Sequence, residues 1–123
     1  MAELLQTHLL QFTSSDSADT DTTWITGGAA STQTLINMLT IQNNDAVEQV
    51  VTVKLQTYVG AAYVAKFAKT YTISAGESEI IAELIGSALI GDASNPDKIT
   101  VAFGTTLTST DTIDCVGSSV KFS

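Results

Sequence analysis

The chain has 123 residues, of which 13 are acidic and 5 are lysine, and it contains no arginine, so its formal net charge is -8. Such a chain repels phosphate backbones and lacks the bidentate donor for phosphate or guanine, which excludes nucleic acid as the expected partner. The same charge disfavours anionic membranes. Because 44% of the residues are hydrophobic and 15% are charged, we expect one domain with a true core.

Short blocks of alternating apolar and polar residues follow one another along the chain and predict β-strands. Turn residues separate these blocks at intervals of about 8 to 12 residues, which is typical of a β-sandwich or jelly roll. We therefore predict an all-β fold: a single antiparallel β-sandwich or jelly roll of about eight strands, with an N-terminal strand or arm. The expected strands are 4–12, a short piece around Trp24, 33–42, 47–58, 66–73, 98–103 and 112–122, the last with a turn at 117–119.

The segments 33–42 and 78–89 allow more specific predictions. In 33–42 the alternation places Leu35, Leu39 and Ile41 on one face of the strand. In 78–89 the apolar residues fit a helical stripe as well as a strand, so both structures stay open there, with strand favoured.

The first strand is apolar on both faces, which a half-exposed edge strand does not require. Either a neighbouring subunit covers it or it is a central strand of one monomeric sandwich. Trp24, in a polar acidic segment, also requires a cover. We therefore divide the chain into 1–24, an N-terminal strand and acidic loop with the character of an intersubunit arm, and 25–123, the β-sandwich domain. The predicted interface residues are Leu4, Leu5, Leu9, Leu10, Phe12 and Trp24.

No set of residues in the chain fits a known kind of catalysis, so we predict no enzyme activity, no cofactor and no metal. His8 and Cys115 are the single histidine and the single cysteine, and they would meet only if the first and last strands pair. Asp16, Asp19 and Asp21 offer oxygen ligands for Ca²⁺ but lack the glycine and glutamate of an EF-hand. A solvated acidic loop is the simpler interpretation, and Ca²⁺ binding stays open.

The first twelve residues carry an acid and no lysine, and they lack the apolar core and cleavage site of a signal peptide. No uncharged apolar stretch approaches the roughly 20 residues of a membrane span. We therefore expect synthesis and folding in a reducing cytoplasm, without a membrane partner.

Three runs, TLINMLTIQNNDAVEQVVTVKLQ, YTISAGESEIIAELI and LIGDASNPDKITVAF, carry a resemblance to a known family. They resemble small β-sandwich virion proteins of tailed bacteriophages, in which a Thr-Leu segment precedes a V-T-V-x-L strand, an I-x-A-G-x-S turn and a Gly-Asp turn into I-x-V. The resemblance covers about residues 34–103. The chain departs from it at Ser74, where proline is common, and by an insertion at 93–96.

The resemblance implies a non-enzymatic virion structural protein, foremost a capsid decoration or head accessory protein. Its expected partners are copies of itself, for example in a trimer, and the major capsid or other virion proteins. It would be made in the host cytoplasm and end on the virion, and removing residues 1–24 would abolish assembly while sparing the fold. The alternatives are a tail or neck component, a homopolymeric surface filament built by β-strand addition, and a carbohydrate-binding module with Trp24, Tyr58 and Tyr63 as its platform.

Overall fold

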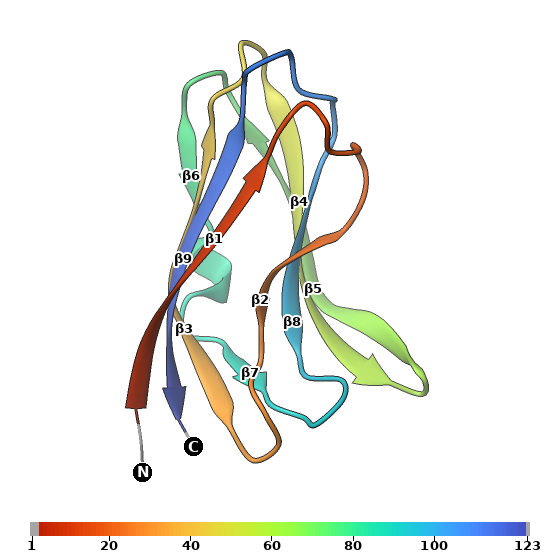
Figure 1. The fold of residues 1–123 in the computed structure, drawn as a ribbon, viewed down its shortest axis with the longest axis vertical. Helices are drawn as coiled ribbons and strands as arrows, with labels where there is room; N and C mark the ends of the chain where they lie inside the picture. Colours follow the sequence, from red (N-terminus) through yellow and green to blue (C-terminus); the bar gives the residue numbers. More distant parts are fainter. Residues whose placement is uncertain (1–2, 123) are drawn as a thin grey trace.

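The computed structural model describes residues 3–122, with side chains from residue 5 onward, and forms two antiparallel sheets packed face to face (Figure 1). The first sheet has the order β1-β9-β3-β6, with β7 also paired to β3, and the second has the order β2-β8-β4-β5. The predicted all-β antiparallel sandwich is therefore confirmed. The elements are β1 (Glu3–Phe12), β2 (Thr22–Thr26), β3 (Gln33–Asn43), β4 (Gln49–Val59), β5 (Ala62–Ile73), β6 (Ser78–Ile80), the 3₁₀ helix η1 (Ala82–Leu84), β7 (Ala88–Ile90), β8 (Lys98–Phe103) and β9 (Ile113–Phe122).

Alternate residues of the central strands fill the core between the sheets. In β4 and β8 the pattern is regular, and the inward residues are Val51, Val53, Leu55, Ile99, Val101 and Phe103. The rings of Phe12 and Phe103 lie 4.8 Å apart between the two layers. The alternation of apolar and polar residues in 47–58 and 98–103 predicts these same inward residues from the sequence, and the structure confirms them.

Residues 3–24 supply one strand to each sheet. β1 pairs with β9 from Glu3 opposite Phe122 to Phe12 opposite Ile113, and β2 pairs with β8. Within one chain, the segment predicted as an arm therefore lies against the chain's own sheets. We no longer expect the fold to survive the removal of residues 1–24.

β3 contains a β-bulge that changes which residues face the core. The register with β9 shifts between Ile36 and Met38, so the faces exchange at that point. Leu39 and Ile41 are buried, but Leu35 is 38% exposed and Ile36 takes the inward place. The prediction that Leu35 shares a face with Leu39 and Ile41 is wrong.

β9 runs without a break, so the predicted turn at 117–119 is wrong. Gly117 lies where β9 crosses the core, and a Cβ added there would lie 3.0 Å from Leu39 Cδ2 and 3.1 Å from Ile25 Cδ1. The glycine makes room for these side chains instead of forming a turn.

The segment 78–89 is neither one strand nor one helix. β6 and β7 pair with opposite ends of β3, and η1 joins them. The Ile81 amide donates to the Leu39 carbonyl over 2.9 Å and the Gly86 amide donates to the Ile36 carbonyl over 2.8 Å, so the segment stays bonded to β3. Gly86 has a φ of 89°, which allows the chain to leave η1 toward β7.

The β4–β5 hairpin extends past the last pair between β4 and β8 and projects from the sandwich (Figure 1). Its two-residue loop has a φ of 59° at Gly60 and 73° at Ala61, the signs that a type I′ turn requires. Ala61 carries a Cβ in this left-handed region, which costs about 1 kcal/mol or more.

We expect Ala61→Gly to raise the free energy of unfolding by about 0.5 kcal/mol, because relief of the left-handed strain exceeds the added freedom of glycine in the unfolded chain. Urea unfolding followed by circular dichroism measures this difference. Ala62→Gly, one residue later in β5, is the control and should lower stability. An equal loss in both variants would contradict the prediction.

A buried carboxylate joins the loop after β3 to two other segments. Asp45 is 3% exposed, and its oxygens accept hydrogen bonds from the Ala46 amide at 2.8 Å, Gln49 Nε2 at 2.9 Å and Thr108 Oγ1 at 2.9 Å. Burial raises the pKa of this carboxyl, but the hydrogen bonds from Gln49, Thr108 and Ala46 together outweigh it and hold the pKa below its ordinary value.

The lowered pKa of Asp45 predicts a loss of stability in acid. A carboxyl with a lower pKa in the folded state stabilises the fold above its ordinary pKa, and this contribution disappears as the pH falls through the lowered value. We expect the free energy of unfolding to fall as the pH drops below about 4, and to fall less in Asp45→Asn than in Glu48→Gln, an exposed control. Urea unfolding across this pH series measures it, and identical slopes would contradict it.

Candidate interaction surface

The outer side of the first sheet exposes large apolar side chains. On β1, Leu5 is 68% exposed and Leu9 is 73% exposed, whereas Phe12 is buried and Leu10 packs against the core. Since alternate residues of a strand face opposite sides of a sheet, Leu5 and Leu9 point away from the core. Only the inner side of β1 is covered by the chain itself.

The neighbouring strands continue this outer surface. One row of paired residues crosses the sheet from β1 through β9 and β3 to β6. Its members, in that order, are Leu9, Val116, Thr40 and Ile80. A second row of paired residues crosses β1, β9 and β3 and consists of Leu5, Val120 and Leu35. We call this surface the apolar face; its exposed large side chains are Leu5, Leu9, Leu35, Met38, Ile80 and Val116, each between 38% and 73% exposed.

The apolar face carries almost no charge. Among the outward side chains of β1, β9, β3, β6 and β7 that the structure describes, Asp114 is the charged one. Gln11 Nε2 donates to its carboxylate over 2.7 Å and Asn44 Nδ2 donates over 2.8 Å. The other charged side chains that the structure describes therefore lie outside the apolar face.

The outer side of the second sheet is more polar, although Val50 on β4 is 43% exposed there. The hydroxyls of Thr52 and Thr70 lie 3.2 Å apart on β4 and β5, and Lys54 Nζ lies 3.0 Å from an Asp21 oxygen. An antiparallel sheet with one face in water normally presents such residues. The first sheet departs from this rule, and a contiguous exposed apolar surface marks a site of contact with another molecule.

An open hollow of about 390 Å³ lies on β1 and β9 within the apolar face. The residues that line it are Leu9, Leu10, Gln11, Asp114, Cys115 and Val116. Leu9, the most exposed leucine among the described side chains, therefore stands at the rim of this hollow.

The predicted interface residues divide between the two sides of the first sheet. Leu5 and Leu9 lie on the apolar face, as free surface of the single chain. Leu10 and Phe12 face inward and pack in the chain's own core. The side chain of Leu4 lies outside the described residues.

Trp24 is covered by its own domain. It is 6% exposed, and its Nε1 donates a hydrogen bond to the His8 carbonyl on β1 over 3.2 Å. Because β1 is an edge strand, this bond occupies a main-chain acceptor next to the edge that an added strand would use. The buried indole also cannot form a sugar platform with Tyr58 and Tyr63, which contact each other on the projecting hairpin.

The first and last strands do pair, but they bring no reactive thiol and base together. His8 Nε2 lies 2.7 Å from Ser119 Oγ, and burial lowers the pKa of His8. Burial and then the nearby Asp114 charge raise the pKa of the Cys115 thiol to about 12, so it is protonated at neutral pH. Ser119 is fully buried, where no substrate reaches it. The His8–Ser119 contact therefore links β1 to β9.

The acidic loop does not gather its carboxylates. Asp16 accepts a hydrogen bond from the Thr13 amide over 2.7 Å, and Asp21 pairs with Lys54. Across the described residues, no group of three His, Cys, Asp or Glu side chains is arranged to hold a metal ion. The structure therefore gives no support to Ca²⁺ binding by Asp16, Asp19 and Asp21, which the sequence left open.

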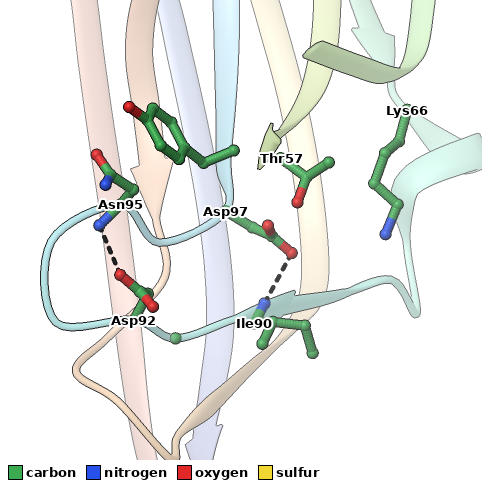
Figure 2. A pocket seen from close by; sticks show the side chains of 8 residues that line it. Thr57, Lys66, Ile90, Asp92, Asn95 and Asp97 are labelled. Carbon is green, nitrogen blue, oxygen red and sulfur yellow. Dashed lines mark hydrogen bonds between the residues drawn. The ribbon is translucent and has the colours of Figure 1, made fainter. Parts of the chain in front are cut away.

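A polar hollow of about 260 Å³ lies between the β4–β5 hairpin and the loop from β7 to β8 (Figure 2). The Asp92 carboxylate accepts from the amides of Ser94 and Asn95, both at 2.9 Å, and the Asp97 carboxylate accepts from the Ile90 amide at 3.0 Å. Figure 2 shows Lys66 set apart from both carboxylates. These acids order the loop.

No family model and no curated protein matches the chain. Between residues 3 and 122 no helix is long and apolar enough to cross a membrane. The apolar face is thus the feature that bears most directly on function.

Proposed function

We propose that this chain is a non-enzymatic structural protein of a tailed-phage virion, foremost a capsid decoration or head accessory protein that acts by assembly. The observation that carries the proposal is the apolar face, an exposed surface of mostly uncharged side chains on the outer side of the first sheet. A monomer has no use for such a surface, because its exposure to water costs free energy and invites aggregation.

The resemblance of residues 34–103 to small virion proteins supplies the setting for this assembly. Decoration places many copies on one particle, so contacts that are weak singly give stable attachment together. The net charge of -8 suits the outside of a shell, because densely packed DNA inside would repel it. Tail and neck positions share this exterior setting and remain the nearest variants of the proposal.

A surface filament built by strand addition receives less support. Such a filament would pair a strand of one copy with a free edge of the next. The indole of Trp24 already bonds to the His8 carbonyl of edge strand β1, so a strand that paired there would compete with this contact.

Immunogold electron microscopy of the source organism tests the proposal. Antibody against the purified chain is applied to cells and to phage particles purified from an induced or infected culture. We expect gold on the heads of intact particles, and gold on tails or necks would move the assignment within the virion. Label on cell-surface fibres, or particles without label, would overturn the proposal.

A further inference from the structure

We propose that two copies of this chain pair through the apolar face, sheet against sheet, about a two-fold axis. The inference rests on the proposed function in one respect: it takes assembly to be the task of this face and names a second copy as the partner there. It requires no particle, so purified protein can test it.

Charge points to a second copy as the occupant. Two molecules that each carry a net charge of -8 repel each other, and they approach with least cost where neither presents charge. Among the described side chains the apolar face comes closest to this condition, because it carries one charge, Asp114, whose carboxylate accepts hydrogen bonds from Gln11 and Asn44. A partner selected by basic residues would instead meet the acidic remainder of the chain.

The area of the face is sufficient for a dimer. β1 and β9 each have 10 residues and β3 has 11. With about 3.3 Å per residue and about 4.8 Å between strands, these three strands and the three-residue strands β6 and β7 together present about 600 Å² per copy. Pairing would bury about 1,200 Å² in total, the lower end of the range for specific and stable interfaces. We therefore expect a reversible dimer.

The local shape favours a two-fold axis. Leu9, 73% exposed, stands beside the hollow on β1 and β9. When a protrusion and a depression are neighbours near an axis, a half-turn places each one into its counterpart on the other copy. Facing sheets in sandwiches pack about 10 Å apart by the same interdigitation of side chains. A trimer, by contrast, needs two different complementary surfaces on each copy.

Sedimentation velocity across a concentration series tests the pairing. The wild-type chain should shift from monomer to dimer and stop there. Leu9→Glu brings a charge onto each half of the interface and should weaken the dimer at least about ten-fold. At concentrations low enough for the wild type to be monomeric, its thermal unfolding midpoint should match that of the wild type, because Leu9 is 73% exposed and lies outside the core. Val59→Glu is the matched control: Val59 is 58% exposed on the projecting hairpin, and its substitution should leave the dimer intact.

A cysteine placed at the centre of the face tests the symmetry. Ser118 lies on β9, opposite Thr7 on β1 and Met38 on β3, and points outward. Under diamide, Ser118→Cys should form a disulfide with its own counterpart and give a covalent dimer. The wild-type chain, with only the buried Cys115, and Thr72→Cys on the second sheet should give none.

Each outcome decides the inference. A wild-type monomer at all concentrations, an open-ended series of masses, or Leu9→Glu that dimerises like the wild type would overturn it. A dimer whose antibody leaves phage particles unlabelled would keep the inference and reject the virion function. Labelled particles together with a strictly monomeric chain would reject the inference and keep the virion function.

Discussion

A chain that begins at residue 25 is expected to lose cooperative folding. The truncation removes β1, which pairs with β9 along its length, and exposes a new sheet edge. It also removes Phe12 and Trp24 from the core, where they are 2% and 6% exposed. The loss of one such aromatic side chain costs about 3–5 kcal/mol, against a total stability of about 5–15 kcal/mol for a typical domain. Urea unfolding followed by circular dichroism measures the result.

Two single substitutions on β1 separate packing from assembly in this experiment. Phe12→Ala should lower the free energy of unfolding by about 3–5 kcal/mol, because it opens a cavity against Phe103. Leu9→Ala should change the stability of the monomer by no more than about 0.5 kcal/mol, because the side chain is exposed. A truncated chain that unfolds at the wild-type urea midpoint would restore the interpretation of residues 1–24 as a separable arm.

Asn43→Ala is expected to lower the free energy of unfolding by about 3 kcal/mol. Asn43 is fully buried at the end of β3, and its Nδ2 donates to the Ile73 carbonyl at 2.9 Å and the Val47 carbonyl at 3.0 Å. Its Oδ1 accepts from the Asp45 amide at 2.9 Å. The substitution leaves three main-chain groups without these partners, and each buried group without a partner costs about 1–3 kcal/mol.

The adjacent residue is the control for Asn43. Asn44 is exposed, and its Nδ2 donates to Asp114 at 2.8 Å and to Thr112 at 3.2 Å. Water can replace these bonds, so Asn44→Ala should cost no more than about 0.5 kcal/mol. Urea unfolding of both variants makes the comparison. Equal losses would show that Asn43 does not bind the end of β5 to β3 as we infer.

Local patterns in the sequence were enough to predict the antiparallel sandwich and the inward faces of its central strands. Val51, Val53 and Leu55 on β4 alternate with polar residues because one side of the strand is packed and the other is in water. The turn at 74–77 also follows from a local property of the sequence, because glycine takes the left-handed conformation that the turn requires at Gly76.

Contacts between distant segments decided the remaining features. The bulge in β3 turns Leu35 outward, and Gly117 lies within a strand because Leu39 and Ile25 occupy the space beside it. In the sequence alone, the segment around Leu35 is indistinguishable from a regular strand, and Gly117 is indistinguishable from a glycine in a turn. β9 is unbroken and places Val116 on the same side as Leu9. The predicted turn at 117–119 did not allow for this placement, so the wider apolar face could not be predicted.

The two leucine-rich sides of β1 show the same division most clearly. Sequence by itself determined that β1 is a strand with apolar residues on both sides, since alternation is a property of neighbouring residues. Only the tertiary structure decided that the second sheet covers Phe12 and that nothing within the described chain covers Leu9. The physical reason is that burial depends on which distant strands pack against a face of the sheet. The alternation of side chains along a strand specifies which residues share a face, but not whether another part of the chain covers that face.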